Sequence, residues 1–399
     1  MRRNKYGLSH YRLLTADMGY LVPCGCLDVL PGDTMQVRST ALIRYSPLDN
    51  PVMHPVNIRI HWWYVPNRLL WDGWEDFISG VDTATAPPTV NADAAKPLAD
   101  YLGIPPHSSG TLPVSAFAFR AYNLIFNEWY RDQDLVTEVA EDSQDLQRIA
   151  WGKDYFTSAR PWPQKGTAVS IPLTGDAPVT GLGHADQIFG TTNQNVYETG
   201  GSGTVQYANS QYSGNASGAF YMEEDPNNAG YPNVRADLSA VSAVDVEALR
   251  LAFAQQRFQE ARARYGSRFT EYLKYLGVRA SDGRLQRPEY CGGGRAVTSF
   301  SEVLQTAEGT NPVGTLRGHG IAALQSRQFR RFFEEHGQLI GLLSVRPKSI
   351  YMDGVPRQFL RKDYDDFWQK EFESLGQQSV ATTEVYSDAG EDTTIFGYV

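Results

Sequence analysis

Cysteine is scarce in this sequence of 399 residues, which contains Cys24, Cys26 and Cys291 and no other. An odd number of thiols, two of them separated by a single glycine, fits neither a disulfide framework nor the spacing of a zinc site or a thioredoxin-like motif. We therefore expect reduced thiols and a chain that folds in a cytosolic compartment.

Long apolar runs are also missing. No stretch of 18 or more apolar residues occurs, so we expect no segment that inserts into a membrane. The basic start at residues 1–5 is not followed by the apolar stretch of a signal peptide, and none is expected.

Motifs of enzyme catalysis are absent as well. The sequence has no P-loop, no GxSxG elbow and no HExxH zinc motif. The glycines at 292–294 follow no clear strand, and we interpret them as a loop. The histidines lack metal-ligand spacing, and we expect them to be hydrogen-bonded or exposed. They are His10, His54, His61, His107, His184, His319 and His336. We predict no enzyme, no cofactor and no metal site.

Positive charge is scarce overall but unevenly spread. The net charge is −9, so the chain as a whole is not a simple polyanion binder. Residues 245–370 nevertheless hold 20 Lys and Arg against 14 Asp and Glu. This asymmetry would let one surface face nucleic acid while another stays acidic, although solvated helix faces are the simpler explanation of charge alone.

Aromatic residues and alternating patterns are abundant. Residues 34–45 and 56–65 alternate with a period of two, which predicts two strands with one face in a core. Trp62 shares the face of Ile58 and Ile60, so we expect it in that core. The segment 338–345 is apolar and uncharged, which predicts a strand buried on both faces.

Helices are predicted at fewer places. An apolar stripe of Ala118, Tyr122, Ile125 and Trp129 predicts a helix over 115–130. A second stripe predicts a helix over 244–265, and 364–375 is also interpreted as helical. Short strands are expected at 382–386 and 393–398.

The window 175–240 has a different composition. It contains ten Gly, seven Asn and five Tyr, with one cation, Arg235, against seven acids. It shows no helical or strand period, which is typical of a functional loop or a disordered linker. Its Tyr, Ser, Asn and Gly content is typical of adaptable recognition loops. Many short strands with long insertions favour an antiparallel β-sandwich over a parallel α/β sheet.

Several blocks in order along the chain resemble the major capsid proteins of microviruses, the small single-stranded DNA phages, and especially the gokushovirus branch. The blocks are Leu8-Ser9-His10; Asp17-Met18-Gly19 with Leu21-Val22-Pro23; Val29-Leu30-Pro31-Gly32-Asp33; Pro51-Val52-Met53-His54; Val65-Pro66-Asn67-Arg68-Leu69; Trp71-Asp72-Gly73-Trp74-Glu75-Asp76-Phe77-Ile78; Phe119-Arg120-Ala121-Tyr122-Asn123 with Asn127-Glu128-Trp129; Leu285-Gln286-Arg287-Pro288-Glu289-Tyr290 before Gly292-Gly293-Gly294; and His336-Gly337 with Ile340-Gly341-Leu342-Leu343-Ser344-Val345-Arg346-Pro347. They cover nearly the whole chain apart from 175–240.

The resemblance implies a mainly β fold, an eight-stranded antiparallel jelly-roll β-sandwich with long loop and helix insertions. We expect a single jelly-roll domain over 1–399, with an N-terminal arm and first strand at 1–29. Insertions with helices are expected at 66–167 and 241–295, and a protruding surface loop at 175–240. Family members usually continue past the block that matches 395–398, so a further C-terminal portion is expected in them.

The implied function is a structural one. Identical copies would form a T=1 icosahedral shell, the virion capsid, around a circular single-stranded DNA genome. Scaffolding proteins, DNA pilot proteins and a host surface receptor would be further partners. The 175–240 loop would form an external protrusion at the threefold axes for host contact, with Tyr197, Tyr207, Tyr212 and Tyr221 as candidates.

Two other sets of residues are candidates for function. The basic Arg2, Arg3 and Lys5 are expected inside the shell, near packaged DNA. Trp71, Trp74 and Phe77 are expected where one subunit meets another. A carbohydrate-binding β-sandwich and a glycoside hydrolase on a jelly roll remain alternatives; the second needs two carboxylates in a cleft, and no such pair stands out.

Overall fold

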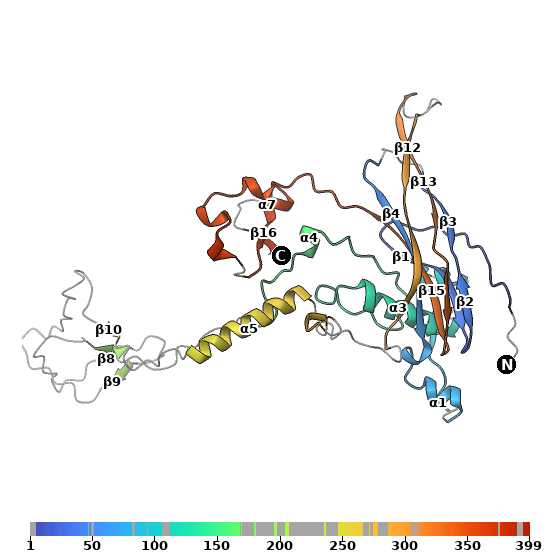
Figure 1. Cartoon of the computed structure of the whole chain (residues 1–399), viewed down its shortest axis with the longest axis horizontal. Coiled ribbons are helices and arrows are strands. Elements are labelled where there is room, and N and C mark those ends of the chain that lie inside the picture. Colours follow the sequence, from blue (N-terminus) through green and yellow to red (C-terminus); the bar gives the residue numbers. More distant parts are fainter. Residues whose placement is uncertain are drawn as a thin grey trace, which may run out of the picture. The chain divides into compact units, whose positions relative to one another are not determined.

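The structure is a computed structural model whose described residues form two compact units, 1–165 with 260–399, and 166–259 (Figure 1). The described residues are 5–46, 48, 52–81, 84–93, 95–105, 112–167, 169, 179–180, 195–197, 204–206, 235–236, 246–265, 271, 274–277, 286–304, 306, 309, 312–373, 376–388 and 394–399.

Four antiparallel strands form the main sheet of the first unit. In spatial order they are β1 (Leu21–Val29), β15 (Gly337–Pro347), β4 (Val56–Pro66) and β11 (Glu289–Val297). The strands predicted at 56–65 and 338–345 are thus confirmed. Leu339 and Ile340, on opposite faces of β15, are both fully buried, as an unbroken apolar run predicts.

A second layer contains shorter strands. β2 (Thr34–Val37) pairs with β14 (Phe329–Phe332), while β13 (Leu316–Gln325) lies between β12 (Ser299–Leu304) and β3 (Thr40–Arg44). The single strand predicted over 34–45 is therefore wrong. The chain changes partners at Ser39, whose backbone N–H donates to Ser326 Oγ and whose carbonyl accepts from the Ser326 N–H, both at 2.8 Å.

The pairs of strands are nested along the chain. β1 pairs with β15, β2 with β14, β3 with β13 and β4 with β11. Early strands therefore pair with late ones, as in one long hairpin. Because β15 also pairs with β4, that hairpin is rolled up on itself.

The interpretation of residues 292–294 as a loop is wrong, because these glycines lie inside β11. A Cβ on Gly293 would collide with the carbonyl oxygen of Ile60, and one on Gly294 would come within 2.7 Å of the Ser326 Cα. Glycine is needed here because β4 and the chain at Ser326 approach the strand so closely.

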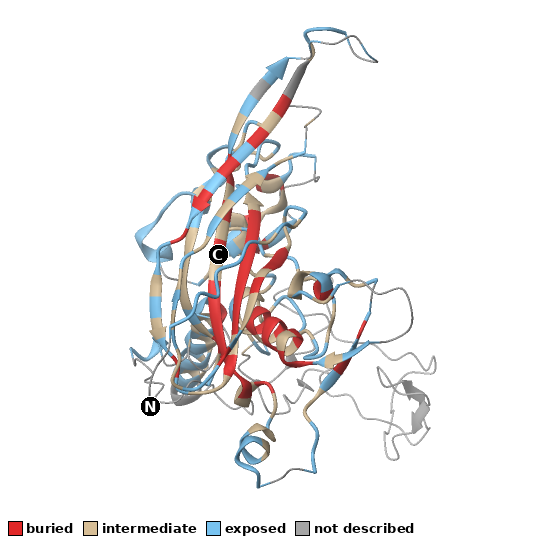
Figure 2. Ribbon diagram, turned by 90° about the vertical axis from the view of Figure 1, so that its right-hand side faces the viewer, coloured by how far each residue is buried: buried red, intermediate tan, exposed pale blue. Residues whose placement is uncertain are grey.

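Two hydrophobic cores lie on opposite faces of the main sheet, since alternate residues of β4 belong to different cores. The buried residues gather in the strands of this sheet and in the helix beside it (Figure 2). The first joins both layers, with Ile58, Trp62 and Leu343 from the main sheet and Leu324 from β13. Trp62 is 6% exposed, which confirms its expected place in the core. The second core lies between the main sheet and α3 (Phe117–Ile125).

The helix predicted over 115–130 is confirmed as α3 followed by a π-helical turn, Phe126–Tyr130. Tyr122 and Ile125 are fully buried against the sheet, and the Tyr122 hydroxyl donates to the Leu21 carbonyl at 2.8 Å. Trp129, in the π-helical turn, is partly exposed. The same helix face thus leaves the core where the helix changes pitch.

Short elements complete the first unit. They are η1 (Asn67–Leu69), α1 (Trp74–Ser79), β5 (Thr89–Ala92), α2 (Pro97–Leu102), β6 (Leu112–Ser115), α4 (Tyr155–Ser158), η4 (Arg357–Phe359), η5 (Tyr364–Asp366), η6 (Lys370–Phe372), β16 (Ser379–Ala381), α7 (Thr382–Val385) and β17 (Ile395–Tyr398). β5 pairs with β6, and β16 with β17.

Two predictions near the C-terminus are wrong. The helix expected over 364–375 is instead two separate 3₁₀ turns, η5 and η6, with extended backbone at Phe367 and Gln369. Its aromatic side chains are exposed, and a short helix without a packed face is marginal in water. The strand expected over 382–386 is the helical turn α7, where Glu384 accepts from the N–H of Ala381 at 3.0 Å. The strand expected over 393–398 is confirmed as β17.

The second unit contains two short strand pairs. β7 (Val179–Thr180) pairs with β10 (Arg235–Ala236), and β8 (Asn195–Tyr197) with β9 (Thr204–Gln206). The predicted helix over 244–265 is confirmed as α5 (Val246–Tyr265), whose residues divide between the two units. No helix in the described ranges is long and apolar enough to cross a membrane.

Candidate assembly surface

The three aromatic residues predicted at a subunit interface lie together just after β4. The Phe77 ring lies 5.5 Å from Trp71 and 6.3 Å from Trp74, measured between centroids. All three side chains are partly buried. Gly73 permits this packing, because a Cβ there would come within 2.8 Å of the Trp71 ring.

The inner side of this group is anchored in the core. Trp74 makes edge contacts with Phe117 at 5.4 Å and with His336 at 5.5 Å. Trp71 and Trp74 pack against the core under α3, whereas Phe77 belongs to neither core. Trp71 and Trp74 therefore anchor this segment to the core, whereas Phe77 packs on their rings without being part of either core.

Apolar surface continues beyond Phe77. Ile78 is 50% exposed and Val81 is 78% exposed. Gly80 ends α1 with a positive φ of 79°, and the Val81 N–H turns back to the Asp76 carbonyl at 2.9 Å. We call Phe77, Ile78 and Val81 the α1 patch.

A second apolar surface lies at 350–372, where the sequence predicted none. This segment contains only 3₁₀ turns, yet it carries large side chains that are strongly exposed, with Trp368 at 76% and Met352 at 86%. The exposed large side chains are Ile350, Tyr351, Met352, Phe359, Tyr364, Phe367, Trp368 and Phe372. A monomeric protein rarely exposes so many apolar groups in one stretch, which indicates a contact surface.

Helix α5 also carries exposed apolar residues. Leu251, Phe253, Phe258 and Tyr265 are all exposed. Leu251, Phe258 and Tyr265 belong to the apolar stripe of the predicted helix, and each is more than 40% exposed although Tyr265 packs on Tyr275 at 5.0 Å.

The other predicted residues cannot be assembled into a site. Lys5 is exposed, and Arg2 and Arg3 lie outside the described residues. Tyr197 ends β8, while the other three tyrosines proposed for host contact, at 207, 212 and 221, lie outside the described residues. The roles of these residues stay predictions.

A buried polar chain lies under α3. Trp63 Nε1 donates to the Tyr130 hydroxyl at 3.1 Å, and that hydroxyl lies 2.7 Å from Nδ1 of His61. Burial lowers the pKa of His61 to about 4, helped by the positive charges of Arg59 and Arg346. The neutral ring therefore accepts the Tyr130 hydrogen and carries its own proton on Nε2.

The thiols are not poised as nucleophiles. Burial raises the pKa of Cys24 and of Cys26 to about 11, and that of Cys291 to about 12. All three are free thiols. A thiol protonated at neutral pH attacks slowly, so these residues are core groups.

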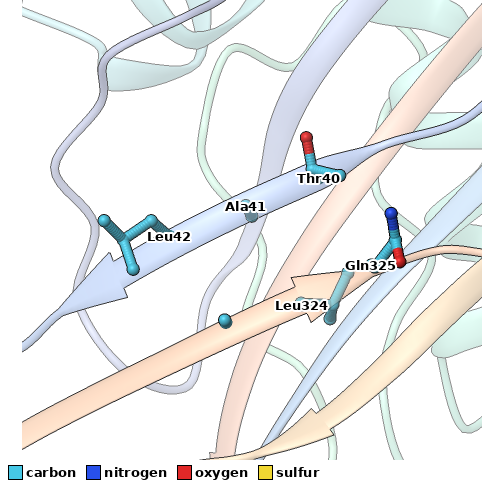
Figure 3. A pocket seen from close by; sticks show the side chains of 6 residues that line it. Thr40, Ala41, Leu42, Leu324 and Gln325 are labelled. Carbon is cyan, nitrogen blue, oxygen red and sulfur yellow. The ribbon is translucent and has the colours of Figure 1, made fainter.

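Sites for metals or small ligands are not apparent in the part of the chain that the structure describes. That part contains no group of three His, Cys, Asp or Glu side chains able to hold a metal ion. An open hollow of about 340 Å³ lies on the second layer (Figure 3). It is lined by Thr40, Ala41, Leu42, Ala323, Leu324 and Gln325, none of which is titratable.

Exposed aromatic surfaces on a β scaffold are typical of proteins that work by association. Comparison with known proteins agrees with this class. The chain belongs to the phage family described as capsid protein (F protein), which matches residues 1–399. It is therefore a capsid protein and a component of the virion, and it is not an enzyme.

Three relatives are all described as capsid protein VP1. The chain is 33% identical to that of Bdellovibrio phage phiMH2K over 423 residues, 99% of this chain and 79% of the relative. It is 33% identical to that of Chlamydia phage 1 over 469 residues (97% and 78%) and 29% identical to that of Spiroplasma virus 4 over 442 residues (99% and 79%). The microvirus resemblance is confirmed, and it decides against the carbohydrate-binding and hydrolase alternatives.

The sequence offered a usable signal for the surface that was missed. The block from Tyr364 to Phe372 contains four aromatics at a helical spacing and four acidic or basic residues. An aromatic stripe this short can pack on the core of its own chain or on a partner, and a high aromatic content is typical of an interface core.

Proposed function

We propose that this protein is the major capsid protein of a small icosahedral T=1 shell around a circular single-stranded DNA genome. The nested strand pairing carries the proposal. If β2 with β3, β11 with β12, and β13 with β14 are each halves of a single strand, then within the two layers the first strand pairs with the last, the second with the second-to-last and the third with the third-to-last. This is the connectivity of a jelly roll, which is common in viral shells. The β5–β6 pair, inside the long insertion, would supply the innermost pair of the eight.

Subunit contacts are assigned to the α1 patch, Trp71 and Trp74 at its inner edge, and the exposed side chains of 350–372. An interface core is rich in aromatic residues and poor in charge, and shell formation would remove these groups from water. Because a capsid protein assembles with itself, we assign a second copy of the chain as the partner of these surfaces.

The test is negative-stain microscopy with light scattering on the purified protein. We expect uniform closed particles, and a Phe77→Ser variant that folds but assembles poorly. A Leu42→Ser variant serves as a control, because Leu42 of β3 is exposed and lies outside these surfaces. A wild-type protein that stays monomeric at high concentration would contradict the proposal.

We further propose that the 175–240 window forms an external protrusion at the threefold axes and contacts a host receptor through its tyrosines. Its composition supports this, because Tyr, Ser, Asn and Gly suit adaptable recognition. Deleting 200–230 should leave particles assembling but poorly infectious. Loss of assembly would instead make the window an interface element.

The basic arm of Arg2, Arg3 and Lys5 is proposed to neutralise DNA phosphates inside the shell, with scaffolding and DNA pilot proteins as further partners. Binding of this kind is independent of base sequence and sensitive to salt. A triple alanine variant should release its genome at lower salt than wild type. Unchanged salt sensitivity would rule the arm out.

A further inference from the structure

Three arginines lie side by side on the face of the main sheet that carries His61. Arg59 of β4 and Arg295 of β11 are direct partners across the ladder. Arg346 of β15 lies opposite Asn57, two residues before Arg59 on the same strand face. Directly opposite residues of antiparallel strands share a face, so the three guanidinium groups emerge together. We call Arg59, Arg295 and Arg346 the Arg59 cluster.

This arrangement is unfavourable by itself. Like charges directly opposite each other destabilise a sheet. Arg59 and Arg346 are also partly buried, so solvent screens their repulsion less. Burial lowers the pKa of Arg346, and the charges of Arg59 and Arg295 lower it further.

No carboxylate compensates for the repulsion within the described ranges. Arg346 donates to the Ala150 carbonyl at 2.7 Å and Arg295 to Asn57 Oδ1 at 2.8 Å, both neutral acceptors. Arg59 has no hydrogen bond or ion pair with any residue that the structure describes.

Other arginines of the protein are paired with acids. Arg120 lies 2.7 Å from Asp142, and Arg160 lies 2.9 Å from Asp132. The fold can therefore supply acidic partners, and the Arg59 cluster lacks them. An anionic ligand would remove the repulsion.

Aromatic rings border the Arg59 cluster. His61 follows Arg59 on the same face of β4, and the Tyr290 ring meets it edge-on at 5.6 Å. Tyr290 is 47% exposed. Arg287 lies 4.8 Å above the ring of the partly exposed Trp129, which packs on Trp63 at 5.0 Å. Cations beside exposed rings are what single-stranded nucleic acid requires, because the cations hold phosphates and the rings stack on bases.

We propose that the Arg59 cluster is a phosphodiester-binding site for single-stranded DNA, with Tyr290 as a base-stacking surface. The three arginines come from three neighbouring strands and so span about 10 Å, which is wider than one phosphate ion. The inference rests on the proposed DNA-enclosing function and adds a binding site to it. It also goes beyond the N-terminal arm, because it places a DNA contact on the rigid sheet.

The test measures binding of a fluorescent 20-nucleotide oligo-dT to purified protein by anisotropy at several salt concentrations. One variant replaces the whole Arg59 cluster by glutamine. The matched control replaces three exposed arginines of the second layer or its connections: Arg38→Gln, Arg44→Gln and Arg330→Gln. Both variants lose three positive charges.

The cluster variant should bind at least tenfold more weakly at low salt. Its slope of log affinity against log salt should be smaller by about 2, because each single-strand phosphate contact contributes about 0.7. The control variant should keep most of the slope. Lysine in place of arginine at the three cluster positions should also keep it, since the charge remains. Tyr290→Ala should weaken binding without changing the slope, because stacking releases no counterions.

A melting curve guards against a folding defect. Removing mutual repulsion should leave the melting temperature of the cluster variant no lower than that of wild type. If the triple variant does not fold, the Arg295→Gln variant, at an exposed position, is used alone. Its slope of log affinity against log salt should be smaller than that of wild type by about 0.7, a third of the decrease expected for the triple variant.

Three outcomes would overturn the proposal. The first is an unchanged salt slope in the cluster variant, and the second is a decrease in slope that is equally large in the control variant. The third is full displacement of the oligonucleotide by 10 mM inorganic phosphate at constant ionic strength, which would indicate a simple ion site. Microscopy of the same samples separates this proposal from the function. If wild type forms shells but the cluster variant binds the oligonucleotide as well as wild type does, only the Arg59 cluster proposal is contradicted. If wild type forms no shells, the proposed function is contradicted.

Discussion

Gly341 of β15 lies directly opposite Trp62 of β4, and the indole of Trp62 covers it. A Cβ on Gly341 would come within 2.9 Å of the indole, and one on Gly25 of β1 within 2.8 Å. The indole also donates to Ser39 Oγ at 2.8 Å. One side chain thus spans three strands and ties both layers together at the point where β2 gives way to β3.

Gly341→Val should destabilise the subunit. The added side chain would displace the Trp62 indole from a packed core, and overpacking of this kind costs about 1–3 kcal/mol. Urea unfolding measures the change. Gly7→Val is the control, because a Cβ there meets nothing within 4 Å. A Gly341→Val variant as stable as wild type would show that the indole has room to move.

Trp368→Ser combined with Tyr364→Ser should prevent assembly without unfolding the subunit. Both side chains are more than three-quarters exposed, so the free subunit loses little burial. The hydrophobic contribution to association, in contrast, is lost. Light scattering and melting temperature together test this.

The control for that experiment is Leu42→Ser, at an apolar residue of β3 that is 67% exposed and pairs with β13, not with 350–372. Particles from the control should match wild type. If the double variant forms normal particles, the 350–372 segment is not part of the subunit interface.

Stability should fall as the pH falls from about 6.5 towards 4. The pKa of His61 is about 4 in the folded chain, below its ordinary 6.5, because burial disfavours the charged ring. Between these values the unfolded chain binds a proton that the folded chain does not, so the contribution is complete above pH 6.5 and is lost on acidification. We expect a loss of about 1–2 kcal/mol from this residue between pH 7 and 5.

His61→Gln tests the assignment, because a glutamine side chain can still accept the Tyr130 hydroxyl but does not titrate. Urea unfolding at pH 7 and pH 5 should show a smaller pH dependence in this variant than in wild type. Equal pH dependence in the two proteins would assign the effect to other groups.

The three thiols should react slowly with iodoacetamide in the folded protein. Burial raises the pKa of each to about 11 or 12, so little thiolate exists at pH 8. We expect labelling at least tenfold slower than in protein unfolded in urea, followed by mass spectrometry. Rapid labelling of Cys24 in native protein would indicate that the edge strand β1 opens.

Local sequence patterns were sufficient to predict an element where a single periodic segment packs directly against a core. β4 was recognised by alternation, β15 by its uncharged apolar run and α3 by its stripe, because burial on one or both faces dictates those patterns directly. The family blocks likewise come from the sequence alone, and they led to the capsid class.

Interactions between distant segments decided the rest. Residues 292–294 resemble a loop, yet they form a strand because Ile60 and Ser326 approach too closely for any side chain. Residues 34–45 form two strands because Ser39 meets Ser326, 287 positions away. The periodicity of a short segment carries no information about contacts between residues that are far apart in the sequence.

The sequence by itself therefore determined the β class, the main strands and the capsid family. Only the tertiary structure placed Arg59, Arg295 and Arg346 on one sheet face and left the aromatic side chains of 350–372 without a core. The physical reason is the same in both cases. Residues far apart in the chain acquire a shared environment only after the strands pair, and it is this environment that sets repulsion, burial and exposure.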